Sequence, residues 1–101
     1  MDIEIETAEG IEYSTELEEH TQHQLRHVER RFGERLTRVL VYLKDERPGK
    51  GGVDKSCRME ARPAGKEPVV VNSTEETVFA AVRSGAEKLE KALARRVGDK
   101  P

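Results

Sequence analysis

The closing third of the chain has the most regular pattern of apolar and polar positions. Its apolar residues recur every three or four positions, as on one face of an α-helix, and the segment ends in a basic run. The stripe consists of Phe79, Val82, Ala86, Leu89 and Leu93. A second stripe with helical spacing consists of Leu17, Thr21, Leu25, Val28 and Phe32. The pattern predicts two amphipathic helices, the first of which ends near Gly33.

Both predicted helices follow a Ser or Thr that has a Glu three residues later. This is the spacing of a capping box, in which two side chains satisfy free N–H groups of the first turn. Thr15 and Glu18 have this spacing at the first helix, and Ser73 and Glu76 have it before the last. We therefore expect the helices to begin at these positions.

Four shorter segments, 2–7, 36–43, 55–62 and 69–73, alternate polar and apolar residues or are rich in β-branched residues, which predicts strands. The stretches between the last three contain Gly and Pro and predict loops. The resulting order is β-α-β-β-β-α. It favours an α+β fold in which two parallel helices cover one face of a four-stranded, mostly antiparallel sheet.

The composition indicates one modest, mostly aliphatic core. A length of 101 residues suits a single domain, hydrophobic residues make up 35% of it, and the aromatic residues are two Tyr and two Phe. Charged residues make up 38%, but the formal net charge is only −2 because acids crowd the first twenty residues. A strongly basic nucleic-acid binder is excluded, whereas a local basic patch is not.

No pattern in the chain predicts catalysis. A nucleophile with its base, a phosphate-binding glycine loop and a cysteine pair are all missing, so we expect no enzyme activity, cofactor or small-molecule substrate. The single cysteine, Cys57, lies in a predicted strand and is expected to be buried. It fits a reducing compartment, and the chain has neither a signal peptide nor an apolar run of membrane-spanning length. We expect a cytoplasmic protein without a membrane partner.

His20, His23 and His27 share one side of the first predicted helix. Two His one helical turn apart can bind zinc or nickel, but a stable site needs further ligands, and the neighbouring arginines would repel a cation. We therefore expect no metal site. A histidine-based metal sensor is kept as a weaker alternative function.

The basic residues of both helices lie in their C-terminal halves, a placement that the helix macrodipole alone would favour. In parallel helices these halves would meet and could follow a phosphate backbone. The candidate RNA-binding residues are Arg26, His27, Arg30, Arg31, Arg83, Lys88, Lys91, Arg95 and Arg96, with Arg35 nearby. Because aromatic residues are so few, we expect no stacking platform for unpaired bases and predict recognition of folded RNA by its shape.

Over essentially its whole length the chain resembles short members of the ribosome hibernation-promoting factor and ribosome-associated inhibitor A family. The resemblance rests on the order of the elements and on several segments. They are Ser14-Thr-Glu-Leu17, Arg31-Phe-Gly33, the strand 36–44, the segment 54–62, Val78-Phe-Ala-Ala-Val82 and Glu87-Lys-Leu89.

The resemblance implies a fold related to double-stranded-RNA-binding domains. It also implies binding to small-subunit rRNA in the channel for messenger and transfer RNA, and a role in holding ribosomes idle in stationary phase or stress. Family members make these contacts mostly with Lys and Arg on the two helices, and the matching positions here are Lys88, Lys91, Arg95 and Arg96. Gln24 and His27 stand where well-known members carry Lys, which leaves two alternatives open: weaker ribosome binding, or binding that depends in part on pH through His27.

We expect residues 1–101 to form a single ribosome-binding domain without the C-terminal dimerisation domain of long family members. Whether the chain promotes or opposes the pairing of ribosomes is left open. The alternative is a protein-interaction module that has kept the fold and lost ribosome binding. The slightly negative net charge of the chain favours this alternative. A free edge of the predicted sheet also leaves room for a homodimer.

Overall fold

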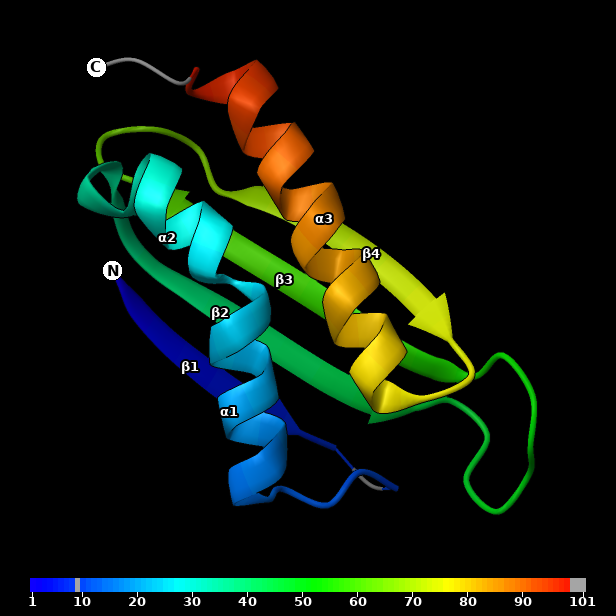
Figure 1. The fold of residues 1–101 in the computed structure, drawn as a ribbon. Coiled ribbons are helices and arrows are strands. Elements are labelled where there is room, and N and C mark those ends of the chain that lie inside the picture. The colour runs from blue at the N-terminus through cyan, green and yellow to red at the C-terminus, as the bar shows by residue number, and fades with distance from the viewer. Residues whose placement is uncertain (9, 99–101) are drawn as a thin grey trace.

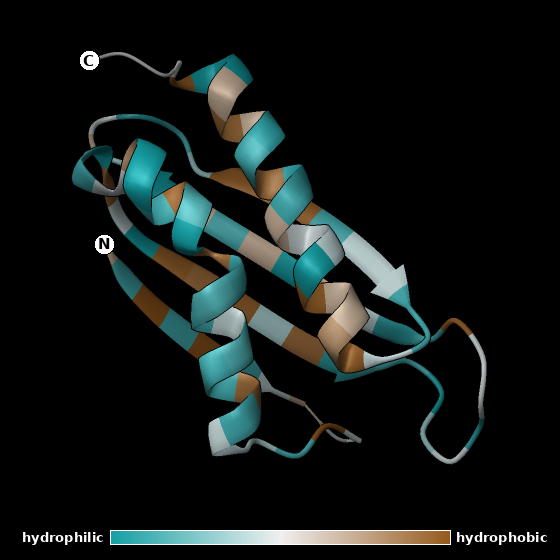
Figure 2. Ribbon diagram, viewed as in Figure 1, coloured by the Kyte–Doolittle hydropathy of each residue, from teal (hydrophilic) through white to brown (hydrophobic). Residues whose placement is uncertain are grey.

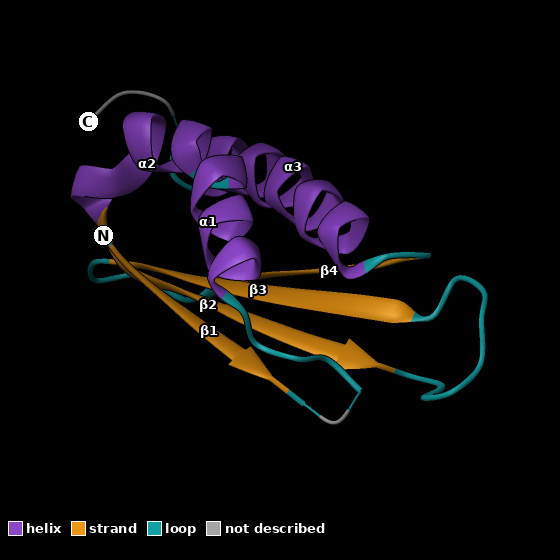
Figure 3. Ribbon diagram, turned by 60° about the horizontal axis from the view of Figure 1, so that its bottom comes forward, coloured by secondary structure: helices purple, strands orange, loops and turns teal. Residues whose placement is uncertain are grey.

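The computed structural model describes residues 1–8 and 10–98, which form a four-stranded sheet and a helical layer on one of its faces (Figure 1 and Figure 3). The strands are β1 (Asp2–Thr7), β2 (Leu36–Asp45), β3 (Lys55–Pro63) and β4 (Val69–Glu75). The helices are α1 (Thr15–Gln24), α2 (Arg26–Phe32) and α3 (Val78–Arg96), and a 3₁₀ turn, η1 (Gly33–Arg35), follows α2. The α+β class and the order of the elements are confirmed, except that the first predicted helix is divided in two.

The strands lie in the order β1-β2-β3-β4. β1 is parallel to β2, and the other neighbours are antiparallel, so the sheet is mostly antiparallel as predicted. A parallel pair requires a crossover connection, which α1, α2 and η1 supply. Ile3 lies opposite Val39, and Ile5 opposite Val41. This register places the apolar positions of both strands on the same face of the sheet.

The first predicted helix is interrupted at Leu25, which separates α1 from α2. Leu25 has φ −89° and ψ 5°, away from α-helical values, although its N–H still donates to Thr21 O at 3.0 Å. One turn earlier, the buried Thr21 hydroxyl donates to Leu17 O at 2.8 Å, a bond of the kind that often bends helices. The prediction of one continuous helix is wrong because apolar spacing carries no information about this local hydrogen bonding.

The predicted capping box at the start of α1 is also wrong. The cap is Ser14, whose Oγ accepts a hydrogen bond from Leu17 N at 3.1 Å. Thr15 is already the first helical residue. The helix begins where it was predicted, but the neighbouring hydroxyl satisfies its free N–H group.

α3 begins later than predicted because β4 continues to Glu75. The cap is Thr77, whose Oγ1 accepts from Ala80 N at 3.1 Å. Ser73, the predicted cap, is a buried residue of β4, and its hydroxyl donates to Ala81 O of α3 at 2.6 Å. The side chain that was assigned to cap the helix therefore joins the sheet to the helix.

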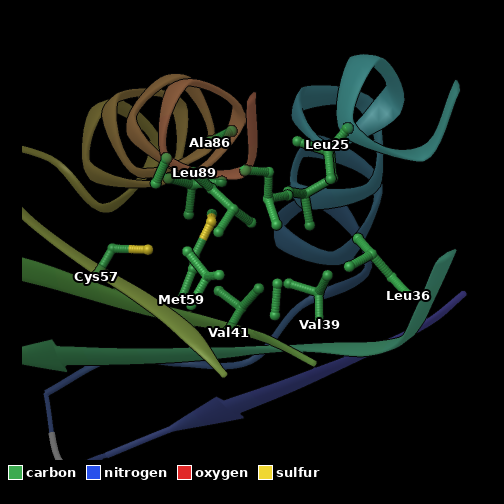
Figure 4. Packing of buried hydrophobic residues seen from close by; sticks show 14 of the residues in the cluster. Leu25, Leu36, Val39, Val41, Cys57, Met59, Ala86 and Leu89 are labelled. Carbon is green, nitrogen blue, oxygen red and sulfur yellow. The ribbon is translucent and has the colours of Figure 1, made fainter. Parts of the chain in front are cut away.

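The hydrophobic core lies between the sheet and the helices. Figure 2 shows polar and apolar residues alternating along the strands, as predicted for a sheet with one buried face. In Figure 4, Leu25 and Leu89 point from the helices toward Val41 and Met59 on the sheet, and all four side chains are fully buried.

α3 lies close against β3 and β4 at Gly85. A Cβ atom at this position would be 3.1 Å from Cys57 Sγ and 3.3 Å from Ser73 Oγ, closer than such atoms normally approach. Cys57 is buried, as predicted, and this burial raises the pKa of its thiol to about 12, with partial opposition from a hydrogen bond to Ser73. The thiol is a packing group of the interface between helix and sheet.

The predicted apolar stripe of α3 is wrong at Phe79. Its side chain is 42% exposed, whereas the four other members of the stripe are buried. The small residues Ala81, Gly85 and Ala92 are buried as well, so the face of α3 on the sheet is rotated away from Phe79. The periodicity missed this rotation because small residues carry little hydropathic signal.

Candidate nucleic-acid interface

The helical layer presents the predicted basic residues to solvent. α1 and α2 run beside α3 in the same direction, so that α2 and the C-terminal half of α3 lie at one end of the layer (Figure 1). All nine candidate RNA-binding side chains are exposed. The structure therefore leaves each of them accessible, but it does not gather them into one surface.

The basic residues of α3 point in different directions. Arg83 lines a groove that it shares with α1. Lys88 is five residues further on, about 140° around the helix, and its Nζ donates to Asn72 O of the edge strand β4 at 2.9 Å. Arg95, two turns after Lys88, lies on the same side as Lys88. Lys91 lies between the two sides and faces away from the sheet.

Arg31 and Arg35 connect the C-terminal end of α2 to the C-terminal end of α3. Arg31 Nη1 lies 2.6 Å from Glu90 Oε2 of α3, and its guanidinium is 5.0 Å from the centre of the Phe32 ring. Arg35 donates to Val97 O at 3.3 Å and also lies over the Phe32 ring, at 5.4 Å. These arginines hold the ends of α2 and α3 together around one aromatic ring.

Arg26 of α2 lies on the side of the helical layer that faces away from α3. It lines a hollow of about 350 Å³ together with Gln22, Glu29 and the N-terminal residues 1–3. This hollow includes no residue of α3. Arg26 is therefore separated from the candidates on α3, whereas Arg30, four residues later on α2, lies on the same side of the helix as Arg26.

Most of the candidates have no partner within residues 1–8 and 10–98. For seven of them no hydrogen bond or ion pair of the side chain is found there: Arg26, His27, Arg30, Arg83, Lys91, Arg95 and Arg96. Glu87 and Glu90 interrupt the basic residues along α3. The outward face of the layer thus carries separated cations with acids between them.

A groove of about 270 Å³ lies between α1 and the first turns of α3. It is lined by His20, Gln24, Thr77, Phe79, Ala80 and Arg83. His20 Nε2 is 2.9 Å from Phe79 O, and since a carbonyl can only accept, this nitrogen carries the hydrogen. The rings of His20 and Phe79 are 4.8 Å apart at an interplanar angle of 79°, an edge-to-face contact.

Sequence reasoning missed this groove. Phe79 was assigned to the core and His20 was considered only as a metal ligand, so neither entered the predicted site. The available signal was the position of Phe79 at the margin of the apolar stripe, about 80° around the helix from Leu89. Gln24, at a position where the resemblance expects Lys, lines the groove, whereas His27 is exposed outside it.

A buried pair of carboxylates lies outside the helical layer, at the base of the β2–β3 loop. Lys55 Nζ is 2.6 Å from Asp54 Oδ1 and 3.6 Å from Asp45 Oδ2. The hydrogen bond to Asp54 raises the pKa of Lys55 and keeps its ammonium charged. Asp54 Oδ2 is buried and has no hydrogen-bond partner in the described part of the chain. This trio anchors the start of β3.

The described residues include no group of three His, Cys, Asp or Glu side chains that could hold a metal ion. Among the helices that the structure describes, none combines the length and the apolar character needed to span a membrane.

Two solved structures have the same fold over nearly the full length of this chain. A ribosomal subunit interface protein from Coxiella burnetii is 18% identical, with a TM-score of 0.76, and the match covers 95% of this chain and 97% of that one. The N-terminal domain of Thermus thermophilus Protein Y is 19% identical, with a TM-score of 0.76 and coverage of 95% and 99%. At this level of identity the likeness shows the fold.

Comparison with curated proteins gives no significant match. A family model does match: that of the Sigma 54 modulation protein / S30EA ribosomal protein family, over residues 4–99. The match spans almost all of the sheet and helical layer described above, and it agrees with the resemblance inferred from the sequence. The chain therefore belongs to the Sigma 54 modulation protein / S30EA ribosomal protein family, whose members are ribosome-associated factors that modulate translation.

Proposed function

We propose that this protein is a non-enzymatic factor that binds rRNA of the small ribosomal subunit, in the channel for messenger and transfer RNA, and holds ribosomes idle in stationary phase or stress. Family membership supports ribosome binding, and the resemblance noted above supplies the subunit and the channel. Such a role would place the protein in the cytoplasm, where ribosomes are.

The observation that carries the proposal is the set of exposed cationic side chains without partners on the helical layer. Lys91, Arg95 and Arg96 are exposed on the second half of α3, and Arg30 is exposed on α2, at the same end of the layer. Phosphate oxygens are the partners that such side chains bind in RNA. The acids between the cations predict a moderate affinity. The contacts between cations and phosphates predict that this affinity falls as the salt concentration rises.

The test is co-sedimentation of the protein with isolated small subunits, large subunits and vacant ribosomes across a salt series. The variant Lys91→Glu/Arg95→Glu/Arg96→Glu should lose small-subunit binding, because three phosphate contacts become repulsive. Removing three contacts should also lower the slope of log affinity against log salt by about 2–3.

A matched control reverses three charges elsewhere. Lys50, Arg58 and Lys66 are exposed on the β2–β3 loop, on the sheet face away from the helices and on the β3–β4 turn. The variant Lys50→Glu/Arg58→Glu/Lys66→Glu should bind nearly as wild type does. Full binding by a folded helix variant would refute this site. Recovery of a specific protein partner without ribosomes would favour the interaction module instead.

A further inference from the structure

The groove between α1 and α3 exposes an aromatic ring that the fold does not need on its surface. Phe79 is 42% exposed, although it lies in the first turn of a helix whose apolar face is otherwise buried. Its position is well defined, because His20 contacts its ring and hydrogen-bonds its carbonyl oxygen. The edge-to-face contact with His20 does not enclose the Phe79 ring, and its exposure leaves part of the ring accessible to a flat partner.

A free cation lies next to this ring. Arg83 follows Phe79 by four residues, so the two side chains are neighbours on the helix, with about 5–6 Å between their Cβ atoms. Arg83 is exposed, and its guanidinium has no ion pair or hydrogen bond within the described residues. Gln24 on the opposite wall of the groove carries an amide that can donate and accept hydrogen bonds.

We propose that this groove binds one unpaired RNA nucleotide, with its base stacked on Phe79, its phosphate on the Arg83 guanidinium and its base edge on Gln24. The proposal rests on the proposed function and adds an unpaired nucleotide to the RNA that the protein binds. It replaces the expectation from composition that the chain has no stacking platform: one exposed ring is enough for one base.

The dimensions and the chemistry of the groove both favour a nucleotide. Its volume of about 270 Å³ lies below the range of about 300–1,000 Å³ that is typical of sites for drug-sized ligands, so it suits a single ring system. The ligand must present a flat apolar surface within a few ångströms of a negative charge. A nucleotide has both in one unit, whereas a base inside a duplex is stacked on its neighbours and cannot reach the ring.

The chain offers a direct spectroscopic test, because it contains only two phenylalanines. With ¹³C-labelled phenylalanine rings in the full chain, Phe79 reports on the groove, and Phe32, which is 1% exposed, serves as an internal control. Titration with single-stranded hexa-adenylate should move the Phe79 ring signals upfield and leave those of Phe32 unchanged. Inorganic phosphate and a stable, blunt-ended GC-rich RNA duplex should not produce this shift.

Variants then separate stacking from charge. Phe79→Leu keeps the apolar volume but removes the aromatic face, and it should weaken binding of the hexamer about fivefold or more, whereas Phe79→Tyr should preserve binding. Arg83→Gln should weaken binding about tenfold. Tyr13→Leu removes another exposed aromatic ring, and Arg95→Gln removes a cation on another side of α3, so both should have smaller effects.

The proposal is overturned if the hexamer leaves Phe79 unshifted, if Phe79→Leu binds it as wild type does, or if the duplex shifts the ring equally. Loss of ribosome binding by Phe79→Leu without a shift by the hexamer would also overturn it and would assign the groove to a ribosomal protein. If wild type shows the shift but does not co-sediment with ribosomes, the nucleotide site stands and the proposed function fails.

Discussion

Arg31 of α2 and Glu90 of α3 form an ion pair across the helical layer, with 2.6 Å between Arg31 Nη1 and Glu90 Oε2. The two residues are 59 positions apart in the sequence. Their side chains remain partly exposed, at 36% and 27%, so the pair lies in a well-solvated region of the surface. A cation that was predicted to contact RNA is thus held in the free protein by an acid of the same surface.

Replacing Glu90 by Gln should therefore affect RNA binding more than stability. An exposed ion pair contributes about 0.2–1 kcal/mol, so the free energy of unfolding in urea should fall by less than about 1 kcal/mol. The variant removes the ion pair between Glu90 and Arg31 and takes a negative charge away from the proposed interface. Ribosome affinity in the co-sedimentation assay should rise, with a steeper dependence on salt.

Glu87→Gln is the matched control for this variant. Glu87 is exposed on the same helix, and no ion pair of its side chain is found in the described residues, so the substitution removes the same charge but keeps the ion pair between Arg31 and Glu90. An equal gain in affinity from both variants would show that the ion pair with Glu90 does not limit RNA binding by Arg31.

Gly85→Val should destabilise the fold, because α3 packs too closely on β3 for a side chain. A Cβ at this position would already be 3.1 Å from Cys57 Sγ and 3.4 Å from Met59 Cε, and valine adds two more methyl groups. Overpacking of this kind costs about 1–3 kcal/mol. The measurement is the urea midpoint at an unchanged m-value.

The control for Gly85 is Gly51→Val in the loop between β2 and β3. A Cβ there would meet no atom within 4 Å, and Gly51 does not have a positive φ. Its midpoint should stay near that of wild type. A Gly85 variant as stable as this control would show that α3 can move off the sheet without cost.

The buried thiol of Cys57 predicts a loss of stability in alkaline solution. Burial raises the pKa of this thiol to about 12 in the folded chain, whereas an unfolded cysteine ionises near about 8.5. The unfolded chain therefore loses its proton first. The stabilisation is complete below about pH 8.5 and is lost as the pH rises toward 12, by up to about 1.4 kcal/mol per pH unit.

Comparison with Cys57→Ala isolates this effect, because the titration of all other groups is shared by the two proteins. The difference in unfolding free energy between wild type and variant should be constant near neutral pH and should shrink between about pH 9 and pH 11. A difference that stays constant over this interval would mean that the thiol is accessible to solvent in the folded state.

Much of the fold could be predicted because burial follows local spacing. The alternation of Cys57, Met59 and Ala61 with charged residues identified the inner face of β3, and all three side chains are buried. The basic candidates were predicted to be exposed because they lie outside the apolar stripes, and they are. For the site, the pattern predicted accessibility but not direction, since five residues along one helix separate Arg83 from Lys88 by more than a third of a turn.

The sequence by itself determined the strands, the approximate helices, the buried face of the strands and the family, because these depend on residues that are close together in the chain. Tertiary structure alone decided that Arg31 meets Glu90, that Lys88 binds the carbonyl oxygen of Asn72, and that His20 contacts Phe79 in a groove. Each of these contacts depends on how a rigid helix is rotated and placed on the sheet. The rotation follows from the packing of small residues such as Gly85, and no periodicity records it.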